Sequence, residues 1–464
     1  MFSFLKRGPG FYRQVVTLAT PIVLQNLITS TLAMADTFMV GLLGEQPMAA
    51  VALANIPLFV VQLFVFGVQS GATVLISQYW GKQDLKTINR VMGVAFWVAG
   101  IVSLAVALVL GLIPEQFLSL FGEDMALVAL AAKYGRIAGL SYFINCFSMV
   151  YIAAFRSMEN PRLGMYILMA SMTCNTFLNW VLIFGNLGAP AMGVEGAALA
   201  TLIARCLEVA IMAVHMVRNR HFRLRPALVF VPGTDTLKRF VRYGGPVVLN
   251  ETMWGLGTSI FPTIMGHMDN SQEILAAYTL SGNVEKICSV AAFGLAATAS
   301  IIIGREIGAG RSKTVHEVGL ALNTLSALCG VVVGIFLLLF VNLGAPVLVF
   351  PLFKLSEGAQ RVCCMMLIIH AFIMPLKDFN TTNIVGVLRG GGDVRAATMI
   401  DVFPLWGVAI PLAYLASFIP GQAILWVYLA MSSEQLVKAL VGVWRLRSGK
   451  WINDLTRIGQ EQPE

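Results

Sequence analysis

The chain has 464 residues, of which 57% are hydrophobic and only 12% are charged, and its mean hydropathy is +0.78. A soluble domain usually carries about 25% charged residues. The composition therefore excludes an ordinary soluble protein and predicts one membrane-embedded unit over nearly the whole chain. The formal net charge is +8, but Lys and Arg lie in short segments between apolar runs. This distribution fits membrane orientation better than binding to a nucleic acid.

Apolar runs recur along the whole chain and set the predicted elements. About twelve of them reach the roughly 20 residues that a helix needs to cross a hydrocarbon core of about 30 Å. In chain order we predict spans over residues 15–43, 52–79, 92–120, 134–155, 163–187, 194–217, 241–267, 275–303, 315–350, 360–388, 396–419 and 422–446. The runs are too long and too uniformly apolar for the strands of a membrane barrel, so each must be a helix.

The loops between these spans differ in charge. Most of the 32 Lys and Arg residues fall on one side, including Arg389 after the tenth span, whereas Lys133, Arg136, Lys354 and Arg361 fall on the other. Positively charged loops stay on the cytoplasmic side of a membrane. With an even number of spans, both chain termini are then predicted to be cytoplasmic. The first apolar run lacks the cleavage site of a signal peptide, so we expect it to remain as the first span.

Short matches between the two halves indicate an internal duplication. T-P-I-V-L-Q-N (20–26) opens the first span and G-P-V-V-L-N-E (245–251) opens the seventh, and A-A-V-A-L (49–53) is matched by A-A-Y-T-L (276–280). The repeats are parallel, and in such transporters the site lies between or within the repeats. We predict an N-terminal six-helix bundle over 1–217, a basic cytoplasmic linker over 218–240 and a C-terminal six-helix bundle over 241–464.

Missing motifs argue against several kinds of chemistry. The sequence has no G-x-x-x-x-G-K-[ST] loop, so an ATP-driven pump is not expected, and it has no H-E-x-x-H or other recognisable catalytic set. The seven Cys residues show no C-x-x-C spacing, so neither a zinc site nor a disulfide framework is predicted. We expect no cofactor and no enzymatic activity. Energy would then come from an ion gradient, which needs ionisable or oxygen-rich sites inside the spans.

Asp36 is the clearest candidate for such a site in the first half. A carboxylate near the middle of a span costs about 2.5–3.5 kcal/mol and must face a partner, water or an ion. Gln25, a candidate substrate or relay group, precedes Asp36 by eleven residues, so both are predicted on one helix face. Asn175 and Asn179 are four apart and also share a face. These groups offer oxygen ligands for Na⁺ or a protonatable acid in a polar network; helix–helix hydrogen bonding is the alternative for the asparagines.

The second half carries more ionisable residues inside its spans. Glu251 in the seventh span and Asp378 in the tenth are further candidates for binding a coupling cation. His370 lies two turns before Asp378 and offers a proton relay. The alternative is a buried histidine that is hydrogen-bonded and has a structural role only. Glu285 and Asp401 are candidate substrate or relay groups.

Other charges in the spans have the spacing of structural ion pairs. Arg205 and Glu208 are three residues apart, and Glu434 and Lys438 are four apart in the favourable order. We predict a salt bridge within one helix for each pair. Lys377 is adjacent to Asp378, but neighbours on a helix point about 100° apart and need not pair.

Several motifs, taken in order, resemble those of the multidrug and toxic compound extrusion (MATE) family. They are D-T-F-M-V-G (36–41), Q-Y-W-G-K-Q-D (78–84), N-x-x-x-N with L-I-F-G (175–185), G-V-E-G-A-A-L-A-T (193–201), G-R-E-I-G-A-G-R (304–311) and G-V-L-R-G-G-G-D (386–393). Together they span nearly the whole chain. Lys377 and the G-G-G turn are similar to the branch of the family that includes the DNA-damage-inducible proteins.

The resemblance implies two pseudo-symmetric six-helix bundles that form a V-shaped cleft and export organic cations in exchange for Na⁺ or H⁺. It implies that Asp36, with Asn175 and Asn179, matches the family's cation-linked acid in helix one. Glu251 and Asp378 match its acids in helices seven and ten, so Na⁺ is expected at Asp36 or at Glu251 and Asp378.

From these features we expect small cationic substrates, contact with membrane lipids, no nucleic acid, and a monomer in the bacterial inner membrane. Three rivals remain. A lipid-linked oligosaccharide flippase of the same superfamily would need a basic cavity, whereas most of the interior charges singled out above are acidic. A channel would need a filter-like loop, and none is visible. A membrane-embedded enzyme would need a catalytic set that the sequence does not display.

Overall fold

The computed structural model describes residues 7–122, 124–219, 222–350, 355–419 and 423–456. Within these ranges the chain is almost entirely helical, and an isolated β-bridge between Gly392 and Ile452 is its only β pairing. Lys354, predicted on the outer side of the membrane, lies outside the described residues, as do both chain ends. The predicted all-α fold is confirmed.

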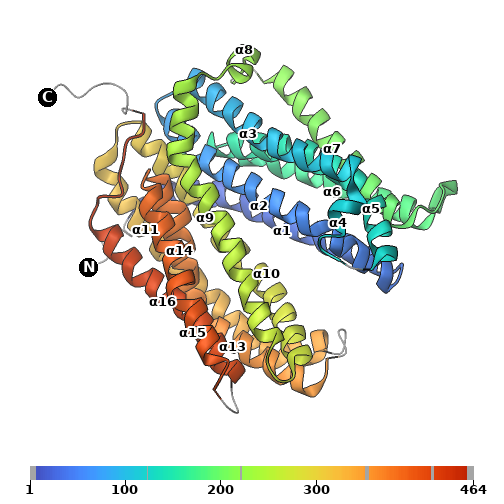
Figure 1. The fold of residues 1–464 in the computed structure, drawn as a ribbon. Helices are drawn as coiled ribbons and strands as arrows, with labels where there is room; N and C mark the ends of the chain where they lie inside the picture. Colours follow the sequence, from blue (N-terminus) through green and yellow to red (C-terminus); the bar gives the residue numbers. More distant parts are fainter. Residues whose placement is uncertain (1–6, 123, 220–221, 351–354, 420–422, 457–464) are drawn as a thin grey trace. The chain divides into compact units, whose positions relative to one another are not determined.

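The helices follow one another with short connections (Figure 1). They are α1 (Pro9–Gly41), α2 (Glu45–Gly81), α3 (Leu85–Leu112), α4 (Pro114–Leu118), α5 (Met125–Ser157), α6 (Pro161–Phe184), the 3₁₀ turn η2 (Asn186–Gly188), α7 (Gly193–Arg218), α8 (Pro226–Phe230), α9 (Thr234–Gly266), α10 (Ser271–Gly308), α11 (Ser312–Leu339), η3 (Phe340–Val349), α13 (Glu357–Thr381), η4 (Thr382–Leu388), α14 (Val394–Pro404), η5 (Leu405–Ala409), α15 (Ile410–Ala416) and α16 (Ala423–Arg447). Elements η3, η4 and η5 are π-helical and continue the helices before them.

Eleven helices in the described ranges are long and apolar enough to cross a membrane. The expected seventh span, 241–267, is present as α9 but is less apolar than the other spans, because polar and glycine residues are frequent in it. The predicted end of the third span at residue 120 is wrong. Helix α3 ends at Leu112, since Pro114 disfavours a helical conformation at the residue before it. Exposed apolar side chains such as Phe336 and Leu440 line the spans, as expected for surfaces in contact with lipid.

Local sequence signals explain where several helices begin. The Asp84 carboxylate accepts a hydrogen bond from the Thr87 amide at 3.0 Å at the start of α3, and Asp124 does the same for Ala126 at 2.9 Å at the start of α5. These side chains satisfy amides that have no partner within the helix. Helices α4, α6 and α8 begin instead with a proline at the first helical position, where the missing N–H costs nothing.

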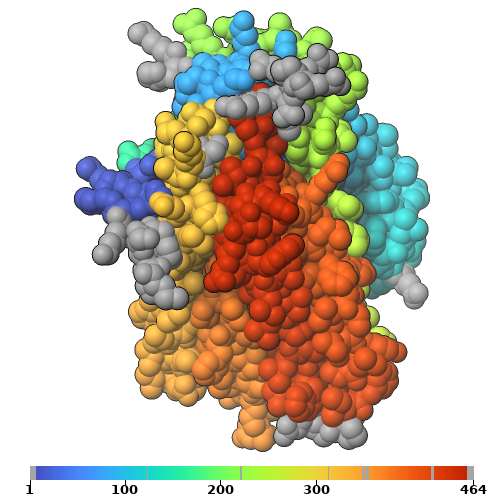
Figure 2. All heavy atoms as spheres, turned by 90° about the vertical axis from the view of Figure 1, so that its left-hand side faces the viewer, coloured from blue at the N-terminus to red at the C-terminus, as the bar shows by residue number. Residues whose placement is uncertain are grey.

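The described residues form two compact units. The first-half unit comprises Leu24–Val248 and the second-half unit comprises Met1–Val23 with Leu249–Glu464. In the first-half unit, α5 packs against α2, α3 and α7. An apolar cluster that includes Leu58, Leu110 and Val128 fills the space between α2, α3 and α5. In the second-half unit, α13 packs against α10, α11 and α16. Figure 2 views this unit from the side on which α16 and the segment after it, in red, lie exposed.

The division between the units falls inside α1 and α9 rather than in the predicted linker at 218–240. It follows Val23 in α1 and Val248 in α9, which are equivalent positions of the T-P-I-V-L and G-P-V-V-L motifs. Each half of the chain thus contributes the first part of its opening helix to the unit formed by the other half. Consistently, Val15, Leu18 and Ile22 of α1 lie in an apolar cluster of the second-half unit.

Glycines allow these exchanged segments to pack closely. A Cβ placed on Gly67 of α2 would lie 2.7 Å from the Cα of Val248 in the first-half unit. At the matching place in the second-half unit, Gly294 of α10 lies directly against Val23. Small residues let helix backbones approach each other in a membrane. The same type of contact therefore recurs in both units, as an internal duplication predicts.

The segment after α16 closes one end of the second-half unit. The Trp451 side chain is fully buried against Gly391 and Gly319, and the Asn453 amide donates to the Gly391 carbonyl at 2.7 Å. Nearby, Arg445 Nε lies 2.6 Å from the Asp393 carboxylate. The G-G-G-D turn thus has a structural role, because any side chain at Gly391 would collide with Trp451.

We expect Gly67→Leu to destabilise the protein by about 1–3 kcal/mol or more, because overpacking forces backbone shifts in a dense interior. Thermal unfolding of the purified protein, followed by size-exclusion chromatography of heated samples, measures the effect. Gly111→Leu is the matched control, since a Cβ at Gly111 meets nothing within 4 Å. Equal melting temperatures for both variants would contradict the close approach of α2 and α9.

Candidate functional site

In the first-half unit, Asp36 joins a chain of neutral polar groups. Asn179 Nδ2 donates to Asp36 Oδ1 at 2.6 Å and also lies 3.1 Å from Asn175 Oδ1. Asn175 Nδ2 in turn donates to Thr201 Oγ1 at 3.2 Å. The chain connects α1, α6 and α7, and both asparagines are 1% exposed. The structure therefore brings together Asp36, Asn175 and Asn179 as predicted and adds Thr201 to them.

Asp36 has no cationic partner in the described part of the chain. It is half-buried and makes its hydrogen bond to an amide, and the nearby Arg205 is engaged by Glu208. The buried Asn179 Oδ1 has no hydrogen-bond partner among the described residues. A carboxylate and a free amide oxygen are ligands that a hard monovalent cation accepts, and the same carboxylate can take a proton. The described residues contain no group of three or more His, Cys, Asp or Glu that would hold a metal ion.

Gln25 does not take part in this series of hydrogen bonds, although it is on the same helix as Asp36. Its Nε2 donates to the Pro161 carbonyl at 2.5 Å, and the side chain is 3% exposed. Eleven residues along a helix correspond to a rise of about 16 Å, so a shared face did not place Gln25 beside Asp36. Its observed contact joins α1 to the start of α6.

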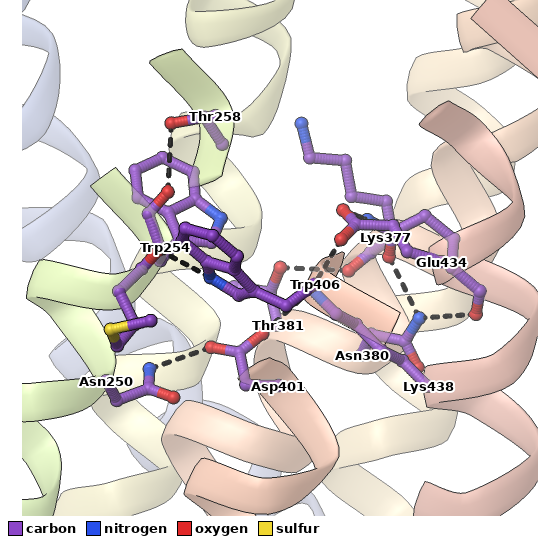
Figure 3. Close-up of polar contacts among 12 residues, drawn as sticks. Asn250, Trp254, Thr258, Lys377, Asn380, Thr381, Asp401, Trp406, Glu434 and Lys438 are labelled. Carbon is purple, nitrogen blue, oxygen red and sulfur yellow. Dashed lines mark hydrogen bonds and ion pairs between the residues drawn. The ribbon is translucent and has the colours of Figure 1, made fainter. Parts of the chain in front are cut away.

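The second-half unit holds a charged chain of alternating sign, formed by Glu251, Arg389, Asp401, Lys438 and Glu434. Arg389 Nη1 lies 2.7 Å from Glu251 Oε1, and Arg389 Nη2 lies 3.9 Å from Asp401 Oδ2. Lys438 Nζ lies 2.8 Å from Asp401 and 3.2 Å from Glu434. Figure 3 shows Asp401 between Asn250, which donates to it at 2.8 Å, and Lys438. The chain connects α9, α14 and α16.

Arg389 is the least expected member of this chain. It is predicted in the cytoplasmic connection after the tenth span, and it does follow directly on Leu388, where that helix ends. Its side chain is nevertheless buried, only 1% exposed, which the prediction did not anticipate. The π-helix η4 immediately before it adds residues to the helical turn and changes the direction in which later side chains point. A pattern with a period of 3.6 residues does not anticipate this rotation.

Glu285, His370 and Lys377 form a second cluster in the same unit. The Lys377 ammonium contacts the Glu285 carboxylate directly, and His370 Nε2 lies 3.2 Å from it. His370 Nδ1 lies 3.1 Å from the hydroxyl of Tyr428 on α16. His370 therefore pairs with Glu285, on α10, and no hydrogen bond or ion pair joins it to Asp378 in the described structure. Lys377 likewise pairs with Glu285 rather than with its neighbour in sequence.

Asp378 is fully buried, and neither of its carboxylate oxygens has a hydrogen-bond partner among the described residues. The Ser326 hydroxyl donates to its backbone carbonyl at 2.9 Å and not to its side chain. An ionised carboxylate without a partner is costly in such an interior. Asp378 is thus chemically suited to hold a proton, and it lies in the last turn of α13, just before the π-helix η4.

Both pairs predicted from helical spacing are confirmed. Arg205 Nη1 lies 2.5 Å from Glu208 Oε1, and Glu208 is fully buried. Glu434 and Lys438 pair at 3.2 Å. Sequence reasoning missed Arg389, Tyr428, Thr201 and the contact of Lys438 with Asp401. Thr201 and Arg389 each stood in a motif quoted above, G-V-E-G-A-A-L-A-T and G-V-L-R-G-G-G-D, that could have identified them.

Comparison with known proteins agrees with this fold. Residues 21–181 and 246–415 match the sequence profile of the MatE family. The chain belongs to the MatE family, that is, to the MATE transporters. It is accordingly a multi-pass membrane protein of a multidrug efflux family, and the family and its named relatives are transporters rather than enzymes.

Relatives and structural neighbours extend over almost the whole chain. A protein of Thermotoga maritima named "Probable multidrug resistance protein NorM" is 26% identical, over 96% of this chain and 94% of its own. The "Uncharacterized transporter YisQ" of Bacillus subtilis is 24% identical, over 97% of each chain. The MATE transporter VcmN of Vibrio cholerae in its bent form has a TM-score of 0.83 and 19% identity, covering 95% of this chain and 98% of that one. A MOP superfamily transporter of Pyrococcus furiosus has the same TM-score and identity, covering 99% of each chain.

We expect Arg205→Gln to destabilise the protein by about 3–5 kcal/mol, because it leaves the buried Glu208 carboxylate without its cation. The double variant Arg205→Gln/Glu208→Gln should recover most of this loss, since it removes both charges together. Thermal unfolding of the single and double variants in the same detergent measures the cycle. A double variant as unstable as the sum of the two single variants would contradict a buried pair.

Proposed function

We propose that this MATE transporter is a secondary active exporter of small organic cations, driven by exchange for H⁺ or Na⁺ through alternating access. The observation that carries the proposal is the environment of Asp36. This carboxylate lies within a span and has an amide as its partner instead of a tethered cation. A charge of this kind is expensive to keep in a membrane unless an ion or proton completes it.

In the proposed cycle the coupling cation and the substrate favour different states of the protein. Binding of Na⁺ or H⁺ at Asp36, with Asn179 and Asn175 beside it, neutralises the site and weakens the hold on a cationic substrate, which is released outside. A ligand shifts a conformational equilibrium only through its differential affinity for the two states. Asp378, whose carboxylate has no hydrogen-bond partner among the described residues, is a second proposed proton site. Glu251 remains a predicted coupling residue, but its contact with Arg389 sets it apart from Asp36.

We expect Asp36→Asn to abolish gradient-driven efflux while the protein still folds, because asparagine keeps the shape but can neither ionise nor hold a proton. The measurement is efflux of a fluorescent organic cation from proteoliposomes, with a Na⁺ gradient and a pH gradient imposed separately. Glu317→Gln is the matched control, since Glu317 is 64% exposed and pairs with Arg7 outside the candidate site. Gradient-driven efflux by Asp36→Asn at the rate of the control would overturn the role of Asp36.

The same assay tests the proposal as a whole. If the unmodified protein responds to one gradient, that gradient identifies the coupling ion. If neither gradient drives efflux of any of several organic cations, the proposed function fails, and a lipid-linked oligosaccharide becomes the leading substrate. The contacts favour the exporter, because the buried Arg389 and Lys438 and the half-buried Lys377 are each engaged by carboxylates and do not form a basic cavity for a pyrophosphate group.

We further propose that the protein acts as a monomer in the bacterial inner membrane with both termini in the cytoplasm. The excess of Lys and Arg on one side supports this orientation. A protease-cleavable tag added at the C-terminus should be cut in inverted membrane vesicles and protected in intact spheroplasts. The reverse pattern of cleavage would contradict the proposed topology.

A further inference from the structure

We propose that Arg389 is a tethered cation that occupies the coupling-ion position at Glu251, so that Glu251 becomes a Na⁺ site only when the charge of Arg389 is removed. The inference deepens the proposed function and rests on it, because it concerns which carboxylate takes part in the proposed exchange of the coupling ion. By this inference Glu251 does not take part. Arg389 is thereby a residue that determines which carboxylate is free to exchange its cation.

The first step is the contact itself. The guanidinium of Arg389 lies 2.7 Å from Glu251 and 3.9 Å from Asp401, and the side chain is only 1% exposed. Two carboxylates on different helices therefore face one guanidinium. Arginine suits this position because its planar group presents several donors in a fixed arrangement and stays charged. A cation is already present at Glu251, supplied by the chain.

The second step is what holds Arg389 in place. Gly386 and Gly390, four residues apart, both lie against α10: a Cβ on Gly386 would be 2.7 Å from the Ala296 carbonyl oxygen, and one on Gly390 would be 2.8 Å from the Ser300 Cα. The backbone on either side of Arg389 is thus pressed onto a neighbouring helix. This packing fixes the point from which the Arg389 side chain starts, so its position does not depend on the ion pair alone.

The third step is the remaining charge around the pair. Asp401 also contacts Lys438, and Lys438 contacts Glu434. Asp401 on α14 and Lys438 and Glu434 on α16 complete the series of alternating charges that begins with Glu251 and Arg389. The Asn250 amide on α9 also donates to Asp401. Lys438 cannot replace Arg389 at Glu251 without leaving its own two carboxylates. Loss of the Arg389 charge would therefore leave Glu251 as a carboxylate in need of a cation.

The test is binding of Na⁺, measured by thermal unfolding in NaCl against choline chloride at equal ionic strength. It is made in the Asp36→Asn background, so that Na⁺ binding at Asp36 does not contribute. Adding Arg389→Gln should create a Na⁺-dependent rise in melting temperature of about 2 °C or more, because a bound ligand stabilises the folded state by mass action. Adding Glu251→Gln as well should remove this rise.

Two further variants separate charge from shape. Arg389→Lys in the same background keeps a cation at Glu251, and we expect no response to Na⁺. Arg7→Gln controls for the loss of an ion pair in general, since its partner Glu317 is exposed to solvent and should gain no Na⁺ dependence. A Na⁺ response in either of these variants equal to that of Arg389→Gln would overturn the proposal, as would the absence of a response in Arg389→Gln.

Arg389→His keeps the proposal testable if the glutamine variant does not fold. A histidine titrates near pH 6.5, so in the Asp36→Asn background it should show the Na⁺ response at pH 8.5 and lose it at pH 6. The same response at both pH values would overturn the proposal. These are binding measurements, so their outcome is independent of whether the unmodified protein shows gradient-driven efflux. Failure of the proposed function and failure of this inference are thus distinguished.

Discussion

An ionised side chain inside a membrane span must be paired, and the arrangement of both units depends on how this requirement is met. The cost of an unpaired charge there is several kcal/mol by the lowest scales and much more by others. The buried Glu208 has Arg205 on the same helix, and Glu434 has Lys438. Among the described residues, Asp36 receives only an amide hydrogen bond, from Asn179. A carboxylate without an ion-pair partner, such as Asp36, is therefore the best candidate for a functional residue.

The two halves share a backbone plan but use it for different polar contacts. The matched motifs end in Q-N at 25–26 and in N-E at 250–251. Gln25 reaches a backbone carbonyl at the start of α6, whereas Asn250 and Glu251 reach the charged groups of the chain that contains Arg389. The glycine contacts at Val23 and Val248 have nonetheless stayed alike. Packing between helix backbones was retained while the charges diverged.

Sequence reasoning predicted what depends on local spacing and composition. The helices follow from apolar runs, and the pairs Arg205–Glu208 and Glu434–Lys438 follow from separations of three and four residues on one helix. Contacts between distant segments could not be predicted this way. Arg389 and Glu251 are 138 residues apart. The π-helical turn before Arg389 also breaks the period of 3.6 residues from which the direction of its side chain would be predicted.

The family resemblance recovered a different part of the site. It named Asp36, Asn175 and Asn179 together, and the structure joins them by hydrogen bonds. It also named Glu251 and Asp378 as acids of one kind, yet the first lies against a guanidinium and the second has no polar partner for its carboxylate in the described residues. A motif records the type of a residue, whereas its electrostatic role depends on neighbours contributed by other helices.

The difference between a tethered and a free cation bears directly on coupling. A group attached to the chain has an effective concentration set by its tether, in the millimolar range or above for short flexible links, and this concentration is the same whichever side of the membrane the site faces. The occupancy of a free ion instead follows its concentration on the side to which the site is open. In the proposed exchange, a gradient therefore acts at a carboxylate without a tethered cation, and the neutral amide partner of Asp36 supports that role for it.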